Sequence, residues 1–249
     1  MRKQNKKLRN AAAFCLGILL CGFLVQGAGW LKGDRLVFPG VGEILHAFFR
    51  LLGEERTWQQ IGHTLLHLLE ALGVSAVLGT ALGLLQGSSP FLRSLLNPLM
   101  SLLRSIPMIV MTVIIMVLTR YEQVPLIATS LMLIPLIAEA TCEGLVRIDR
   151  ELLDVYRMNS GFNFRVLLSV HLPLMAGYLK QAYINAVGMG IKLAVTTEYL
   201  VQARDSLGKA VYTSAYFNEY AEIYAYALIM ILLALLVSTI PAVFNKKRL

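Results

Sequence analysis

The chain has 249 residues, of which 57% are hydrophobic and only 15% are charged, and its mean hydropathy is +0.64. Soluble domains carry about 25% charged residues, so this composition excludes an ordinary soluble enzyme and a disordered chain. The net charge of +8 does not indicate a nucleic-acid partner, because basic residues on so apolar a chain are typical of topology signals at a membrane surface. We therefore expect an all-α, polytopic membrane protein.

Six stretches are long and apolar enough to predict membrane-spanning helices, which need about 20 such residues. They are 11–31, 62–87, 95–119, 124–146, 174–202 and 223–245. Together they predict one transmembrane domain over residues 11–245, between basic tails at 1–10 and 246–249. The first stretch also has features of a signal peptide. Its long apolar run, and the absence of a small residue before Cys21, favour an uncleaved span.

The basic residues outside these spans predict the orientation of the chain. In a six-span arrangement, thirteen basic and three acidic residues lie on the side of the two termini, a net charge of +10. Seven basic and eight acidic residues lie on the other side, a net charge of −1. Because basic residues concentrate on the cytoplasmic side of a membrane, we expect both termini in the cytoplasm.

The connection at 147–172 is the longest on the basic side, and it has an internal pattern. Asp149 is a favourable N-cap, and an apolar ridge follows it beside charged residues spaced three and four apart. Ser160-Gly161 ends this pattern, and a second apolar run leads to Leu172-Pro173. The pattern predicts a short amphipathic helix that either lies on the bilayer surface or docks a cytoplasmic partner.

The same segment resembles the EAA loop in permease subunits of binding-protein-dependent ABC importers. That pattern reads Glu-Ala-Ala, three residues, Gly, nine residues and Ile-x-Leu-Pro. Here Asp154 takes the Glu position and Ser160 the Gly position, while Val155 and Tyr156 replace the alanines. By this resemblance, the residues of an ATPase-coupling loop are Asp154, Val155, Tyr156, Ser160, Gly161, Leu172 and Pro173.

The resemblance extends over roughly residues 38–240 and is closest to the nitrate/sulfonate/taurine branch of these permeases. The matching positions are Thr64 to Gly79 with Gly83 and Gly87, Leu103-Arg-Ser-Ile-Pro107, Gly188, Glu198 and Ser206-Leu-Gly208. The fold that this resemblance implies is that of a type I ABC importer permease, located in a bacterial cytoplasmic membrane.

The resemblance also implies partners and a mechanism. Such permeases form a dimer, here expected to be a homodimer, and their coupling loops dock on two cytoplasmic ATPase subunits that hold ATP and Mg²⁺. An external binding protein delivers a small substrate, here expected to be a compound with an anionic group, such as nitrate, a sulfonate or taurine, or a nutrient precursor. The chain itself has no G-x-x-x-x-G-K-[ST] phosphate loop, so we expect neither an enzyme nor a cofactor bound by this chain.

Three glycines four residues apart, Gly79, Gly83 and Gly87, place small residues along one stripe of the second span. Such a stripe lets another helix approach closely. The partner is either a helix of the same subunit or the second copy of the dimer, and the sequence leaves both open.

Polar and ionisable residues inside spans are costly in lipid and usually face protein or a water-filled route. The candidate pathway residues are Asn185, Lys192, Thr196 and Glu198. The first three follow helical spacing on one face, where the Lys192 ammonium would attract an anionic substrate. Alternatively, Lys192 forms an internal ion pair with Glu139, Glu143 or Glu198. Glu198 lies on another face and is interpreted as structural.

Two other classes of function are considered. An ion-coupled secondary transporter would show weak symmetry between two halves, but the organised loop occurs once. An intramembrane enzyme would need a grouping such as Ser/His or His-Glu-x-x-His in a span, and none occurs in the sequence. The three cysteines and four histidines have no metal-ligand spacing, so no metal site is expected.

Overall fold

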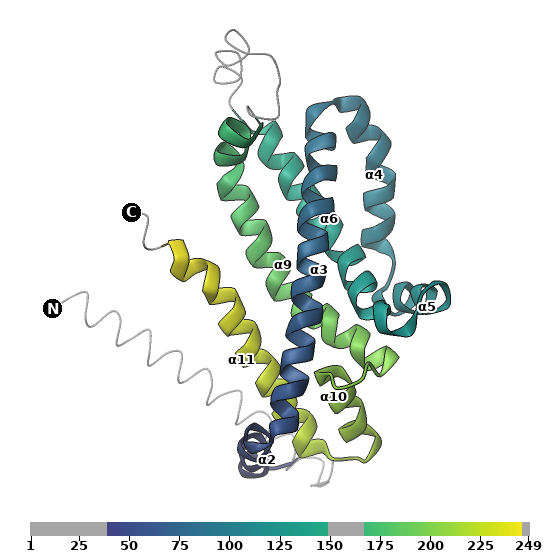
Figure 1. The fold of residues 1–249 in the computed structure, drawn as a ribbon, viewed down its shortest axis with the longest axis vertical. Helices are drawn as coiled ribbons and strands as arrows, with labels where there is room; N and C mark the ends of the chain where they lie inside the picture. The colour runs from purple at the N-terminus through teal and green to yellow at the C-terminus, as the bar shows by residue number, and fades with distance from the viewer. Residues whose placement is uncertain (1–38, 149–166, 246–249) are drawn as a thin grey trace, which may run out of the picture. The chain divides into compact units, whose positions relative to one another are not determined.

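Helices are the regular elements of the computed structural model, which describes residues 39–148 and 167–245 (Figure 1). The predicted all-α fold class is confirmed. In chain order the elements are α2 (Val41–Gly53), α3 (Glu55–Ser88), α4 (Pro90–Ser105), α5 (Met108–Leu118), η1 (Tyr121–Gln123), α6 (Val124–Val146), η2 (Leu167–His171), α9 (Leu172–Val201), α10 (Leu207–Tyr216) and α11 (Tyr220–Asn245). The expected span at 11–31 and both basic tails lie outside the described residues.

The chain divides into two compact units. The first consists of residues 1–58 and 211–229, and the second of residues 59–210 and 230–249. In the described part, the first unit contains α2 and the beginning of α11, while the second contains most of α3 and all of α4, α5, α6 and α9. The candidate site residues of the described part all lie in the second unit.

Three helical stretches in the described residues are long and apolar enough to cross a membrane: Glu55–Ser88, Tyr121–Val146 and Tyr220–Val237. A fourth is added if α4 and α5 together count as one span. The 30-residue helix α9 is not among them, and it contains Lys180, Lys192 and Glu198.

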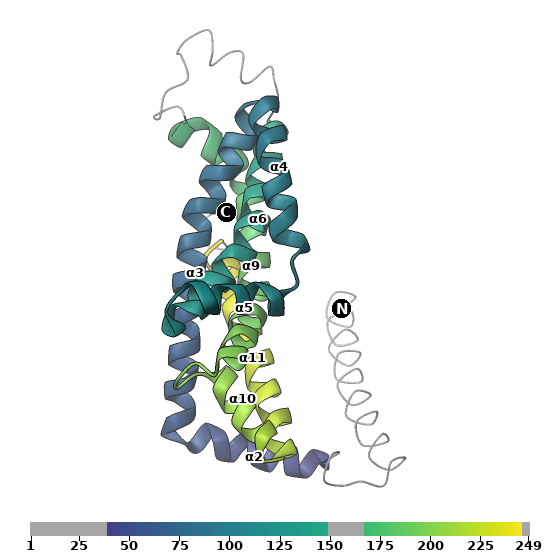
Figure 2. The ribbon, with the colours of Figure 1, turned by 90° about the vertical axis from the view of Figure 1, so that its right-hand side faces the viewer.

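The stretch at 95–119, expected as one helix, is two helices that meet at an angle of 102° (Figure 2). Ile106 and Pro107 between them have extended backbone, with ψ angles of 124° and 138°. A proline disfavours helical backbone at the residue before it and cannot donate the hydrogen bond that would continue the helix. The Leu103-Arg-Ser-Ile-Pro107 segment therefore ends α4, and α5 begins in a new direction.

Helix α6 lies at the centre of the second unit and packs along α9, as both views show (Figures 1 and 2). Its residues Leu133 and Ile137 are fully buried and cluster with Ala186 of α9. A second cluster joins Met111 and Ile115 of α5 to Val124 of α6 and Val201 of α9. These clusters hold α9 against α6 and α5, and this packing determines which face of α9 is left open.

Candidate functional site

The glycine stripe of α3 packs directly against α6. A Cβ atom added at Gly83 would lie 2.4 Å from the Ala138 carbonyl oxygen and 2.5 Å from the Thr141 Cβ atom. At Gly79 the added atom would lie 2.8 Å from the Ile137 Cβ atom, and at Gly87 it would lie 2.8 Å from Leu145. All three glycines therefore make close approaches inside the subunit, and the approach is tightest at Gly83, where the neighbours are a backbone carbonyl and a Cβ atom.

Glu198 is fully buried where α9 meets α3 and the first turn of α10. Its carboxylate accepts hydrogen bonds from the Thr64 hydroxyl at 2.8 Å and from the Gly208 backbone N–H at 3.3 Å. The His67 Nδ1 atom lies 2.8 Å from the other carboxylate oxygen. Because a buried carboxylate is costly unless it is paired and hydrogen-bonded, these contacts explain how the helix tolerates it.

Lys192 lies on an exposed face of α9 together with other polar residues. This face carries Gln181, Asn185, Lys192 and Thr196, and we call these four residues the polar row. Within the row, Gln181 donates a hydrogen bond of 3.1 Å to Asn185, and the Thr196 hydroxyl donates one of 2.7 Å to the Lys192 carbonyl. Lys192 lies seven positions after Asn185, so the row continues along one side of the helix over several turns.

The carboxylates proposed as partners for Lys192 bind other groups. Glu139 pairs with Arg104 of α4, and Glu143 lies 3.8 Å from Arg147, the residue that caps the end of α6. Glu198 has the partners described above. Among the described residues, no carboxylate lies within ion-pair distance of Lys192.

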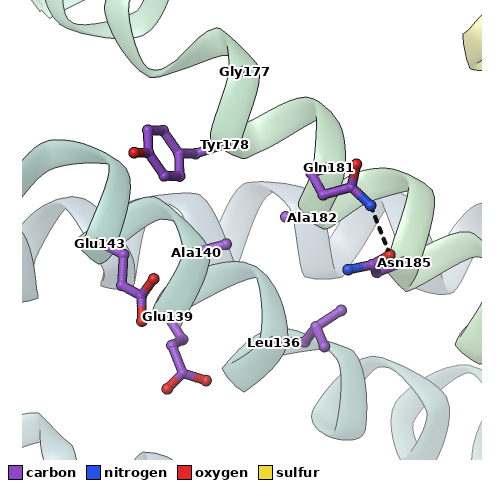
Figure 3. Close-up of a pocket in the computed structure, with 9 residues that line it drawn as sticks. All are labelled: Leu136, Glu139, Ala140, Glu143, Gly177, Tyr178, Gln181, Ala182 and Asn185. Carbon is purple, nitrogen blue, oxygen red and sulfur yellow. Dashed lines mark hydrogen bonds between the residues drawn. The ribbon is translucent and has the colours of Figure 1, made fainter. Parts of the chain in front are cut away.

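A cavity of about 640 Å³ lies between α6 and α9 at one end of the polar row. Figure 3 shows Glu139 and Glu143 on the α6 side, and Tyr178, Gln181 and Asn185 on the α9 side. The helical spacing of Asn185 and Lys192 also predicts that Gln181 lies on this face, because Gln181 is one turn before Asn185. The sequence contained no comparable signal for Tyr178.

A smaller cavity of about 220 Å³ lies between α4 and α6. Arg93, Arg104, Glu139 and Glu143 line it, and Arg93 donates a hydrogen bond of 3.1 Å to the Cys142 sulfur. Glu139 and Glu143 thus lie between the two cavities, with the arginines of α4 on one side and the open face of α9 on the other.

Most residues of the predicted coupling loop lie outside the described part of the chain: Asp154, Val155, Tyr156, Ser160 and Gly161. Leu172 is the first residue of α9 and Pro173 the second, and the π-helical segment η2 precedes them directly. The end of the predicted loop therefore continues directly into the helix that carries the polar row.

Residues 77–247 match the family described as "Binding-protein-dependent transport system inner membrane component". This match covers more than half of the chain. The chain belongs to this family. It is therefore a permease subunit of an ABC importer, a multi-pass inner membrane protein and a transport subunit rather than an enzyme.

The fold of the permease is similar to that of a solved structure, the MetNI methionine ABC transporter in inward-facing conformations. The TM-score is 0.64 at 17% sequence identity, and the similarity covers 76% of this chain and 93% of the other chain. The search of curated proteins finds no match. The predicted type I importer permease fold is confirmed.

Proposed function

We propose that two copies of this permease form the pore of an ATP-driven importer that takes up a small anion by alternating access. Separate ATPase subunits dock on the loop at 147–172, and an external binding protein delivers the substrate. The substrate belongs to the classes carried by the nitrate/sulfonate/taurine branch, or is a nutrient precursor of similar charge. In this arrangement both termini are cytoplasmic, and ATP and Mg²⁺ are held by the ATPase subunits. The alternative of an ion-coupled secondary transporter is not favoured by the family.

The polar row on α9 is the observation that carries this proposal. An ammonium and two amides facing lipid would be costly, so such residues face protein or a water-filled route. Lys192 is exposed and none of the described carboxylates pairs with it, which leaves it available to an anion. The adjoining cavity of about 640 Å³ is large enough for a small solute.

The continuity of α9 supports coupling between the loop and the route. The helix begins at Leu172, where the predicted coupling loop ends, and continues for 30 residues to Val201. Lys192 lies on the same unbroken helix. A displacement of the loop by the ATPase subunits would therefore move the polar row, because a helix transmits motion along its axis with little internal change.

The proposed coupling is tested by purifying the permease with its ATPase subunits and measuring ATP hydrolysis in nanodiscs, with and without loaded binding protein. We expect the wild-type chain to co-purify with an ATPase subunit, and Asp154→Lys to lose most of this association, because it reverses a charge in the docking helix.

Glu122→Lys is the matched control, since it makes a similar charge reversal at an exposed position in η1, away from the loop, and is expected to keep the ATPase subunit. Absence of any ATPase subunit from the wild-type preparation would refute the proposed function. Normal docking by Asp154→Lys would refute the role of the loop.

A further inference from the structure

The junction around Glu198 brings together three segments that are separated in the sequence. Thr64 and His67 come from one face of α3, Glu198 from the last turns of α9, and Leu207-Gly208 from the start of α10. Besides its bond to Glu198, the Thr64 hydroxyl accepts a hydrogen bond of 3.0 Å from the Leu207 backbone N–H. One carboxylate and one hydroxyl thus connect α10 to both other helices.

The turn between α9 and α10 is held in an unfavourable backbone conformation. Gln202 and Asp205 have positive φ angles of 52° and 50°, which cost non-glycine residues about 1–3 kcal/mol each and persist only where surrounding contacts impose them. Ser206 caps α10, because its hydroxyl accepts the Lys209 backbone N–H at 3.1 Å and donates to the Ala203 carbonyl at 2.7 Å. The Ala203 backbone N–H bonds the Glu198 carbonyl at 3.0 Å within the turn, and the contacts with α3 and the Glu198 carboxylate add to these local bonds.

The approach of α10 to α9 leaves no room for a side chain. A Cβ atom added at Gly208 would lie 2.4 Å from both the Glu198 Cβ atom and the Tyr199 backbone nitrogen. Glu198, Leu207 and Ser206 are fully buried. The carboxylate of Glu198 therefore lies inside a buried, closely packed contact, where an unpaired donor or acceptor is costly.

We propose that Glu198 is a positioning residue for transport: its carboxylate latches the α9–α10 turn to α3, so that these parts move as one body when the pore changes its access. This inference rests on the proposed function. In that arrangement the turn lies at the outer end of α9, the same helix whose other end meets the coupling loop. Because the latch makes this connection rigid, a displacement of α9 is transmitted to α3 and α10. A flexible turn would absorb the displacement.

The latch requires a hydrogen-bond acceptor, not a charge. In Glu198→Gln, the amide oxygen can accept from Thr64 and Gly208, and the amide nitrogen can donate to His67 in its neutral form. In Glu198→Leu, the side-chain volume is similar but every acceptor is lost. Glutamine should therefore preserve the latch and leucine should break it.

The first measurement needs no partner subunit. Spin labels at the exposed positions His63 on α3 and Arg204 in the turn, in a chain without its native cysteines, report their separation by double electron–electron resonance in nanodiscs. We expect one narrow distance distribution in the otherwise unaltered chain and in Glu198→Gln, and a distribution about twice as broad in Glu198→Leu. A narrow distribution in Glu198→Leu, or a broad one in Glu198→Gln, would overturn the latch.

Should Glu198→Leu fail to fold, Thr64→Val decides the same question, because it removes the bonds to both Glu198 and Leu207. Its control is Thr141→Val. Thr141 is equally buried, but its hydroxyl bonds only the Ile137 carbonyl of its own helix. Broadening in Thr64→Val but not in Thr141→Val supports the latch, and no broadening in either overturns it.

The second measurement uses the permease assembled with its ATPase subunits and binding protein. A broken latch should lower transport about tenfold, within the range of typical coupling energies, while ATP hydrolysis stays within about twofold. Glu198→Gln should transport normally. A merely structural role would lower both activities together. Because the distance measurement is made on the permease alone, failure of the ATPase to associate would refute the proposed function without deciding the latch.

Discussion

Single residues show how this chain tolerates polar groups in a mostly apolar environment. Glu198 is buried and bonded to three partners, whereas Lys192 is exposed and has no carboxylate partner among the described residues. The two residues lie on the same helix, six positions apart. The sequence indicates a structural role for Glu198, but it contains no signal for the partners that the structure shows. An internal ion pair of Lys192 with Glu139, Glu143 or Glu198 is not what the structure contains.

At the residue scale we predict that Lys192→Met lowers uptake of an anionic substrate about tenfold or more, since a hydrogen bond to a charged group contributes about 1.5–3 kcal/mol. Labelled nitrate and an alkanesulfonate are the probe substrates, with their binding proteins supplied. Lys192→Arg keeps the charge and should retain most of the uptake. Equal uptake by the methionine variant and the wild type would show that Lys192 does not contact the substrate.

Pairs of helices explain the architecture of the second unit. The glycines of α3 let its backbone approach α6, and α6 in turn packs along α9 through Leu133, Ile137 and Ala186. Since lipid gives no hydrophobic driving force between helices, association depends on such close van der Waals packing and on interhelical hydrogen bonds. The stripe of small residues therefore contributes to the packing of α3 on α6.

At the element scale we predict that Gly83→Ala destabilises the protein by about 1–3 kcal/mol, as overpacking of a close contact does. The neighbouring atoms belong to the α6 backbone and to a Cβ atom, and such atoms cannot move aside cheaply. Gly73→Ala on the same helix meets nothing within 4 Å and should be neutral or slightly stabilising. Unfolding midpoints of both variants in detergent measure the difference, and equal midpoints would contradict it.

At the scale of the whole molecule, α9 connects three features. The predicted coupling loop precedes this helix, the polar row lies along it, and the Glu198 junction lies at its C-terminal end. The charge distribution of the chain predicts which end is cytoplasmic: the loop side carries +10 and the other side −1. This charge difference is a property of the entire chain, since it is summed over all the tails and connections.

At the scale of the whole molecule we predict that a cysteine at Arg204 reacts with a membrane-impermeant maleimide added to intact spheroplasts, while a cysteine at Arg147 reacts only after lysis. Both positions are exposed, so access to the reagent and not burial decides the outcome. The reversed labelling pattern would show that the termini lie outside and that the coupling loop could not meet cytoplasmic ATPases.

The sequence by itself determined the class of the protein. Apolar composition, six long apolar stretches and the degenerate EAA pattern predicted an all-α importer permease, and the fold class and family are confirmed. Composition and short-range patterns do not depend on how distant segments pack, so they can be read directly from the sequence. The break at Ile106-Pro107 was also visible in the sequence, because proline restricts its predecessor, but the stretch at 95–119 was nevertheless predicted as one helix.

Only the tertiary structure decided which groups meet. The 102° angle between α4 and α5, the pairing of Arg104 with Glu139 across 35 positions, and the contact of Thr64 with Glu198 across 134 positions depend on how distant segments pack. No spacing along the chain encodes these contacts, because each arises from the fit between two helix surfaces. The same packing leaves the Lys192 side chain exposed and buries the Glu198 side chain, so it distinguishes the candidate pathway residue from the structural one.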